Sequence, residues 1–271
     1  MDQLNIISAT GFPRIAYKKT GNGAPLMLLH GFPENHGLWQ RIAPALSERF
    51  TLLLPDIPGS GESSLPDSPT ISMELLSEAV KAIADAEGIT GMVVAGHSMG
   101  GYTSLAFAEK YPSMMKGLSL IHSTATADDA EKKKKRQKSI DIIRNGGKEL
   151  FIKEMTPALF ARQFREQHEE VIQEQIRRGT KLADESIIGF YTAMMNRKER
   201  TAILKAANYP VQMIIGKEET LAPMNVLLEQ ATLADVSFLS RYENSLHMSM
   251  IEQPERLAYD LINFTAYCYS Q

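Results

Sequence analysis

The sequence has few of the features that mark secreted, membrane-spanning or nucleic-acid-binding proteins. It contains one cysteine, Cys268, so it cannot form an internal disulfide bond, and this suits the reducing cytoplasm. No apolar run approaches the roughly 18 residues that cross a bilayer. Residues 1–10 lack the basic start and apolar stretch of a signal peptide. The formal net charge of −3 gives no basic surplus for a nucleic acid. We therefore expect a cytoplasmic protein with neither a membrane nor a nucleic acid among its partners.

The bulk composition is that of an ordinary globular protein. The chain has 271 residues, of which 44% are hydrophobic and 23% charged. A chain of this length can bury a full core, either as one large domain or as a core with an insertion.

Short apolar stretches alternate with helical patterns in the first half of the chain, which predicts strand–helix crossovers and a mostly parallel sheet. The residues between 14 and 19 alternate in polarity and are predicted to form an early antiparallel edge strand. The predicted strands are residues 25–29, 51–54, 91–95 and 117–121, and the predicted helices are residues 37–50, 72–87 and 98–111.

The alternation stops after His122 and resumes near residue 208. Residues 123–207 show only helical segments, whereas strands return at 211–215 and near 236–239, with helices at 223–231 and 254–269. We therefore predict a core formed by residues 1–122 and 208–271. Residues 123–207 are predicted to be a helical cap, or lid, over a site at the strand ends.

One strong run of basic residues lies in the predicted cap, from Lys132 to Arg136 with Lys138 beyond it. It could attract an anionic substrate or surface. Because Asp128, Asp129 and Glu131 offset part of the charge, we favour a solvated helix face.

The most informative motif is Gly96-His97-Ser98-Met99-Gly100, which lies between a predicted strand and a predicted helix. A strand-to-helix turn this tight favours residues without a Cβ at both glycine positions. The turn would point the hydroxyl of Ser98 out of the sheet, beside the N-terminal amides of the helix. This pattern predicts Ser98 as a nucleophile.

A nucleophilic serine needs a general base, and His247 is the predicted one. It lies in a loop between the last weak strand and the final helix, from which an imidazole can return over the sheet. His97 is expected to pack beside the serine, and His36 and His168 to lie on the surface. His122 ends a strand and is expected to be a structural hydrogen-bonding residue.

The base in turn needs an acid that orients it, and Glu219 is the predicted one. It follows the strand at 211–215 and could bind the far nitrogen of His247. Its neighbour Glu218 is the alternative in the same loop.

The predicted oxyanion donors are main-chain amides. His30-Gly31-Phe32-Pro33 follows a predicted strand, so the amides of Phe32 and Met99 form a natural pair. The predicted pocket wall draws on Trp39, Tyr191, Met194 and Met248, although core packing is the expected role of Trp39.

With these motifs the chain resembles the α/β-hydrolase superfamily over nearly its whole length. The resemblance rests on residues 30–33, 56–63 and 96–101, and on the His247 loop with Glu252 and Pro254. It implies an α/β-hydrolase fold with a helical cap after strand 6, no cofactor and no metal. The turn at residues 56–63 resembles one that is mainly structural in the family. Most capped members carry aspartate where this chain has Glu219, so Asp128 or Asp129 is the alternative acid.

The resemblance implies acyl transfer, since Ser98 stands where the related haloalkane dehalogenases and epoxide hydrolases use aspartate. We expect a serine hydrolase, a carboxylesterase that cleaves small apolar esters through an acyl-enzyme. The alternatives are a carbon–carbon bond hydrolase, a lyase-like relative or a slow-turnover ligand receptor of the same fold. The oligomeric state stays open.

Overall fold

The computed structural model describes residues 4–271, and its centre is an eight-stranded sheet. Along the sheet the order is β1-β2-β4-β3-β5-β6-β7-β8, in which β2 pairs antiparallel with β1 and β4 and the remaining pairs are parallel. The strands are β1 (Asn5–Ala9), β2 (Phe12–Thr20), β3 (Ala24–Leu29), β4 (Phe50–Pro55), β5 (Met92–His97), β6 (Met115–Ile121), β7 (Val211–Gly216) and β8 (Ser237–Tyr242).

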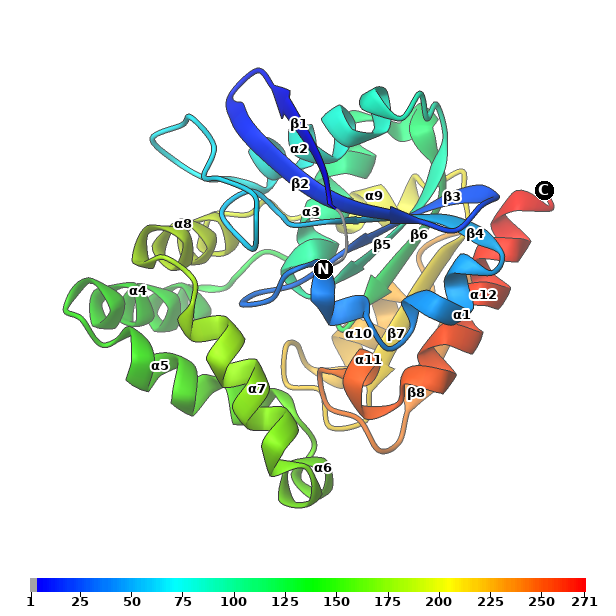
Figure 1. Cartoon of the computed structure of the whole chain (residues 1–271). Helices are drawn as coiled ribbons and strands as arrows, with labels where there is room; N and C mark the ends of the chain where they lie inside the picture. Colours follow the sequence, from blue (N-terminus) through cyan, green and yellow to red (C-terminus); the bar gives the residue numbers. More distant parts are fainter. Residues whose placement is uncertain (1–3) are drawn as a thin grey trace.

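Helices cover both faces of the sheet (Figure 1). The bounds are η1 (His36–Trp39), α1 (Ala43–Ser47), α2 (Met73–Ala86), α3 (Met99–Lys110), η2 (Pro112–Met114), α10 (Met224–Gln230), α11 (Ser249–Glu252) and α12 (Pro254–Tyr269). Successive side chains of β3 point to opposite faces of the sheet, as the two-residue period of a strand requires. Met27 belongs to the hydrophobic cluster that includes α2 and α3, and Leu28 to the cluster that includes α1 and α12. The mostly parallel sheet flanked by helices confirms the predicted fold class.

Between β6 and β7 the chain is helical, as predicted, and α4 to α8 lie together to one side of the sheet (Figure 1). Helix α4 packs against α8, and Ile140 and Ile143 are buried there. The helices are α4 (Ala130–Arg144), α5 (Lys148–Met155), η3 (Thr156–Leu159), α6 (Arg162–Gln167), α7 (Glu169–Thr180), α8 (Asp184–Met195) and α9 (Thr201–Lys205). The division into core and lid, at residues 123–207, stays a prediction.

Two local predictions were wrong. The antiparallel strand predicted at residues 14–19 is present as β2, but it is not at the edge, since it lies between β1 and β4. The edge strand is β1, whose Ile6 is 42% exposed and whose sequence pattern is too weak to predict a strand. The helix predicted at residues 37–50 is broken into η1 and α1, and Pro44 lies in the first turn of α1. Proline lacks the N–H that a continuous helix would need there.

In the described part of the chain, none of the helices has the length and apolar character to cross a membrane.

Candidate active site

Ser98 lies at a sharp turn between β5 and α3. Its φ of 50° and ψ of −114° are unusual for a residue with a side chain. The turn is held by two long-range hydrogen bonds: the Ser98 amide donates to the carbonyl of Ile121 at 3.0 Å, and Ser123 Oγ donates to the carbonyl of Ser98 at 2.8 Å. The end of β6 and the residues just after it thus fix the strained residue in place.

The two glycines of the motif are required by close backbone approaches. A Cβ on Gly96 would collide with the carbonyl of Gly100, and a Cβ on Gly100 would collide with the carbonyls of Leu29 and His30. The end of β3 therefore lies directly against the turn. This contact brings the loop that carries the amide of Phe32 beside the N-terminus of α3, where Met99 is the first residue.

Glu219 and His247 form a hydrogen-bonded pair. His247 Nδ1 lies 2.9 Å from Glu219 Oε2 and 3.2 Å from Oε1. The amides of Thr220 and Leu221 each donate to Oε1 at 2.9 Å, which fixes the carboxylate in its loop. Because a carboxylate only accepts, Nδ1 carries the proton and Nε2 is left as the basic nitrogen.

The pair shifts both pKa values. Burial disfavours the charged form of Glu219, but the nearby His247 and the hydrogen bonds from His122 and His247 hold its pKa well below the usual 4.5. Burial also opposes a charge on His247, but Glu219 outweighs it and raises the pKa above 6.5. The arrangement stabilises an imidazolium next to a carboxylate.

Two further histidines surround the pair. His122 Nδ1 donates to Glu219 Oε2 at 3.1 Å, which fits the hydrogen-bonding role expected for it, and His97 Nε2 donates to the carbonyl of His247 at 2.9 Å. Burial and the two neighbouring imidazoles hold the pKa of His97 well below 6.5, so it stays neutral. The sequence motif placed His97 beside Ser98 but did not reveal that it holds the His247 loop.

His122, Glu219 and His247 also form the one group in the described chain that could hold a metal ion, with ligand atoms within 4.8 Å of one another. The hydrogen bonds between these side chains account for their closeness, and we assign no ion to them.

Glu252 holds the loop that carries His247. Its Oε2 accepts from Ser245 Oγ at 2.5 Å and from the amides of Leu246 and Met248 at 3.2 Å each. Its Oε1 accepts from the amide of Ala161 at 2.7 Å, so one carboxylate joins this loop to the helical segment. The sequence pointed to Glu252 only through the resemblance.

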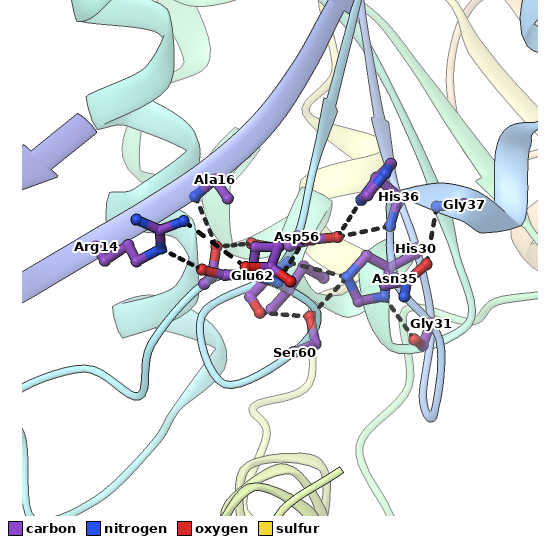
Figure 2. Close-up of polar contacts among 12 residues, drawn as sticks. Arg14, Ala16, His30, Gly31, Asn35, His36, Gly37, Asp56, Ser60 and Glu62 are labelled. Carbon is purple, nitrogen blue, oxygen red and sulfur yellow. Dashed lines mark hydrogen bonds and ion pairs between the residues drawn. The ribbon is translucent and has the colours of Figure 1, made fainter. Parts of the chain in front are cut away.

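A second network holds the loop after β3, and Figure 2 shows it. Asp56 Oδ1 binds both the amide and Nδ1 of His36, at 2.8 and 2.7 Å, and Oδ2 accepts from the amide of Glu62 at 2.8 Å. His30 Nε2 accepts from the amide of Ile57 at 2.9 Å. The side chain of His36, which was expected on the surface, is 22% exposed, and its ring pairs with a fully buried carboxylate that the sequence did not reveal.

Burial would raise the pKa of Asp56, but the bonds from His36 and Glu62 lower it. A charged Asp56 therefore fastens the loop of Phe32 to the turn at residues 56–63. These contacts give that turn a structural role.

The alternative acids lie elsewhere. Glu218 is exposed, and Asp129 caps α4 by accepting from the amide of Lys132 at 2.8 Å. Asp128 binds Arg136 and Arg197. Of the four acids considered from the sequence, Glu219 is the one bound to His247.

Ser98 and His247 line the same cavity, of about 200 Å³. Tyr191 and Met194 line it as predicted, and Phe32 lines it too. Trp39 and Met248 do not, since both are fully buried in the core on the α1 and α12 side, which is the role expected for Trp39. The other lining residues are Tyr102, Arg136, Met155, Ala158, Leu159, Glu219, Thr220, Leu221 and Leu246. The wall is thus more polar than the sequence led us to expect.

A larger cavity, of about 690 Å³, lies between residues 33–37, the turn at residues 59–65 and helices α7 and α8. Neither Ser98 nor His247 lines it. The predicted nucleophile and base therefore line the smaller cavity.

Comparison with known proteins gives a consistent picture. The family model described as the alpha/beta hydrolase fold matches residues 24–254. Lipase 3 of Moraxella sp. is 26% identical over 91% of this chain and 79% of its own length. Lipase 1 of Psychrobacter immobilis is 40% identical over 41% of this chain, and the match spans 35% of that lipase, about a third of its length.

Among solved structures, a thermophilic esterase from Thermogutta terrifontis, with malate bound, is similar to this chain with a TM-score of 0.91. It is 28% identical, and the match covers 98% of this chain and 99% of that one.

Proposed function

Because this chain belongs to the alpha/beta hydrolase fold family, we propose that it is a serine hydrolase that cleaves small carboxylic esters through an acyl-enzyme. The observation that carries the proposal is the Glu219–His247 pair, at 2.9 Å, lining one cavity with the strained Ser98. The lipases and the esterase that resemble the chain support the same class of reaction.

In the proposed reaction His247 acts twice. Its Nε2 takes the proton of Ser98 as Oγ attacks the ester carbonyl, and it then returns that proton to the departing alcohol. Water, activated by the same nitrogen, next attacks the acyl-enzyme and releases the acid. Glu219 keeps the tautomer and stabilises the imidazolium at each step.

The proposed oxyanion donors are the amides of Phe32 and Met99. The close approach of the Leu29 and His30 carbonyls to Gly100 supports this pairing, because it holds the two segments together. Removing one such donor typically lowers turnover by about 10²–10³. Since both donors are main-chain groups, side-chain substitution would not remove them.

We further propose that residues 123–207 act as a cap over the site. Met155, Leu159 and Tyr191 come from this segment and line the cavity with Ser98. A small cavity closed on one side by helices favours short substrates.

Replacement of Ser98 by alanine tests the proposed nucleophile. With short p-nitrophenyl esters we expect turnover to fall by up to about 10⁶, by analogy with other serine hydrolases. A fluorophosphonate probe should label Ser98 in the wild type and leave Ser98→Ala unlabelled.

Circular dichroism and thermal unfolding serve as the control for folding. A variant that keeps more than about a tenth of the activity would place the nucleophile elsewhere. Turnover of vinylogous diketones without turnover of any ester would instead favour the carbon–carbon bond hydrolase.

A further inference from the structure

The catalytic cavity carries two hydrogen-bond donors that the proposed ester hydrolysis does not use. They belong to the side chains of Arg136, from α4, and Tyr102, from α3, and both residues line the cavity with Ser98 and His247. The inference drawn from them concerns the substrate and rests on the proposed function.

Arg136 belongs to a group in which positive charge is in excess. Its Nε donates to Asp128 Oδ2 at 2.5 Å, and Arg197 Nη1 donates to Oδ1 of the same carboxylate at 2.7 Å. Two guanidinium groups therefore share one carboxylate, and one positive charge is left uncompensated. Within residues 4–271, Asp128 is the only carboxylate that pairs with Arg136.

The excess charge lies on the Arg136 side of this group. Arg197 is 2% exposed and spends further donors on the carbonyls of Thr126 and Met194, at 3.0 and 2.9 Å. Arg136 is 17% exposed, and beyond Asp128 its contacts are weak. Nη1 lies 3.4 Å from the sulfur of Met194, and the guanidinium carbon lies 5.6 Å from the centre of the Tyr191 ring. A guanidinium has N–H groups on both edges, so Arg136 retains donors for a ligand.

Tyr102 adds a second donor to the same wall. It is 2% exposed, and among residues 4–271 its hydroxyl has no hydrogen-bond partner. A buried hydroxyl without a partner costs about 1–3 kcal/mol, and because Tyr102 is one of the residues that line the cavity, a ligand bound there that accepts a hydrogen bond would remove this cost. Burial raises the pKa of Tyr102, so the phenol keeps its proton and can donate.

The basic run of α4 has two distinct faces. Lys132 and Arg136, one turn apart, lie on the same side as the buried Ile140, whereas Lys133 and Lys134 are exposed. Lys132 Nζ donates to the carbonyl of Leu221, a cavity residue, at 2.8 Å. The helix period thus directs two of the cations toward the catalytic cavity and leaves others in solvent.

The carboxylate that lines this cavity does not neutralise these donors. Glu219 accepts hydrogen bonds from His247, His122 and two amides of its own loop. While His247 is neutral, the charge of Glu219 is stabilised by these hydrogen bonds, and an imidazolium balances it once His247 takes a proton. The Arg136 side of the cavity remains positive while the Glu219 side performs the acid–base work.

We infer that the substrate is an ester that itself carries a carboxylate, bound by Arg136 and Tyr102 while its ester carbonyl faces Ser98. A carboxylate offers a planar pair of acceptors, which suits one guanidinium edge together with a phenolic hydroxyl. Arg136 and Tyr102 are positioning residues in this proposal, since they bind a part of the substrate remote from the bond that is cleaved.

The test compares esters that match in shape but differ in charge. Monomethyl succinate is paired with methyl 4-methylpentanoate, in which a branched alkyl group replaces the carboxylate of the acid part. Acetoxyacetate is paired with isobutyl acetate, which makes the same replacement in the alcohol part. For at least one pair we expect kcat/KM, measured by pH-stat, to be about 10- to 100-fold higher for the anion, the range that a charge-assisted hydrogen bond gives.

Three variants assign this preference to residues. Arg136→Gln should reduce the anion-to-neutral ratio of kcat/KM by about tenfold or more, mainly through KM, and Tyr102→Phe by a smaller factor. Lys134→Gln removes one charge from the exposed face of the same helix and should leave the ratio unchanged. If Arg136→Gln does not fold, two other measurements test whether Arg136 and Tyr102 bind the carboxylate. They are the anion-to-neutral ratio of kcat/KM in Tyr102→Phe and the fall of that ratio in the wild type at high salt.

The outcomes separate this inference from the proposed function. If the wild type hydrolyses the neutral member of both pairs at least as well as the anion, the inference is wrong while the esterase proposal stands. Equal losses on both members in Arg136→Gln would also overturn it, since they would indicate a structural role. If no ester of any kind is hydrolysed, the proposed function itself fails.

Discussion

Glu219 accepts hydrogen bonds from two imidazoles and two main-chain amides. This surrounding keeps it ionised although its side chain is only 1% exposed. An ionised Glu219 in turn holds His247 in the tautomer with a free Nε2. The protonation states of the site are therefore set by a few side chains from three loops.

Glu219→Gln should lower kcat by up to about 10⁴, the effect of a comparable change in another serine hydrolase, because the amide no longer stabilises the imidazolium. Esterase kinetics with the best substrate checks this value. Glu218→Gln is the matched control, since Glu218 is exposed in the same loop. If Glu218→Gln gives the larger loss, the assignment of the acid is wrong.

The pH profile should report the His247 pKa directly. Because the neutral imidazole is the base, kcat/KM should rise with pH, with a midpoint above 6.5, since Glu219 raises this pKa. In Glu219→Gln the midpoint should move to lower pH, as burial is then less opposed. A profile measured on the residual activity, with no shift between the two proteins, would contradict this coupling.

The short helix α11 and the loop before it show how an element positions a residue. The loop has little regular structure, and Glu252 at the end of α11 supplies the contacts that fix it. The same carboxylate binds the amide of Ala161 in the helical segment. A single side chain thus links the His247 loop to the segment above the cavity.

Glu252→Gln should destabilise the protein by about 1–3 kcal/mol, because an amide cannot accept all of these hydrogen bonds. We also expect a lower kcat, since His247 loses its support. Urea unfolding and esterase kinetics measure the two effects. Glu255→Gln, at an exposed position three residues further on in α12, is the control. Equal effects of the two changes would show that the hydrogen bonds of Glu252 do not support the loop.

The helical period of α4 separates its basic side chains into an exposed face and an inward face. The sequence suggested a solvated face for its basic run, and most of its lysines are indeed exposed. The spacing of Lys132, Arg136 and Ile140 nevertheless puts two cations on the inward side. The tertiary packing of α4 on α8 then decides that this side faces a cavity.

At the scale of the whole molecule, a buried acid lies outside the cavity that Ser98 and His247 line. Glu34 is 4% exposed, and among the described residues its Oε2 has no hydrogen-bond partner. Burial raises its pKa to about 7, although Arg178 opposes the shift. Because the pKa is higher in the folded than in the unfolded protein, this side chain contributes its full share to the free energy of unfolding below the unfolded pKa, near 4.5. That contribution is lost as the pH rises through about 7, where the buried carboxyl must ionise.

Glu34→Gln should therefore change the pH dependence of stability. Between about pH 5 and pH 8 the wild type should lose about 2 kcal/mol more free energy of unfolding than the variant, which has no charge to bury. Urea unfolding of both proteins at the two pH values measures the difference. If the free energy of unfolding changed equally with pH in the two proteins, Glu34 would be ionised in the folded protein throughout this range.

Much of the fold could be predicted from local patterns. The strands at β3 to β7 are short apolar runs bounded by turn residues, and their type does not depend on distant contacts. The edge strand β1 and the break between η1 and α1 were missed because their patterns are weak or interrupted by Pro44. For the site, Ser98, His247 and Glu219 could be proposed because each lies in a turn or loop after a predicted strand, although the strand before His247 has a weak pattern.

The sequence by itself determined the order of strands and helices, the glycine-flanked turn at Ser98 and the positions of the histidine and acid loops. These depend on interactions between neighbours in the chain. Only the tertiary structure decided that Glu219 binds His247, that His36 pairs with Asp56 and that Tyr102 and Arg136 share a wall with Ser98. Those pairings join residues far apart in sequence, and their geometry is set by how the sheet and its helices pack.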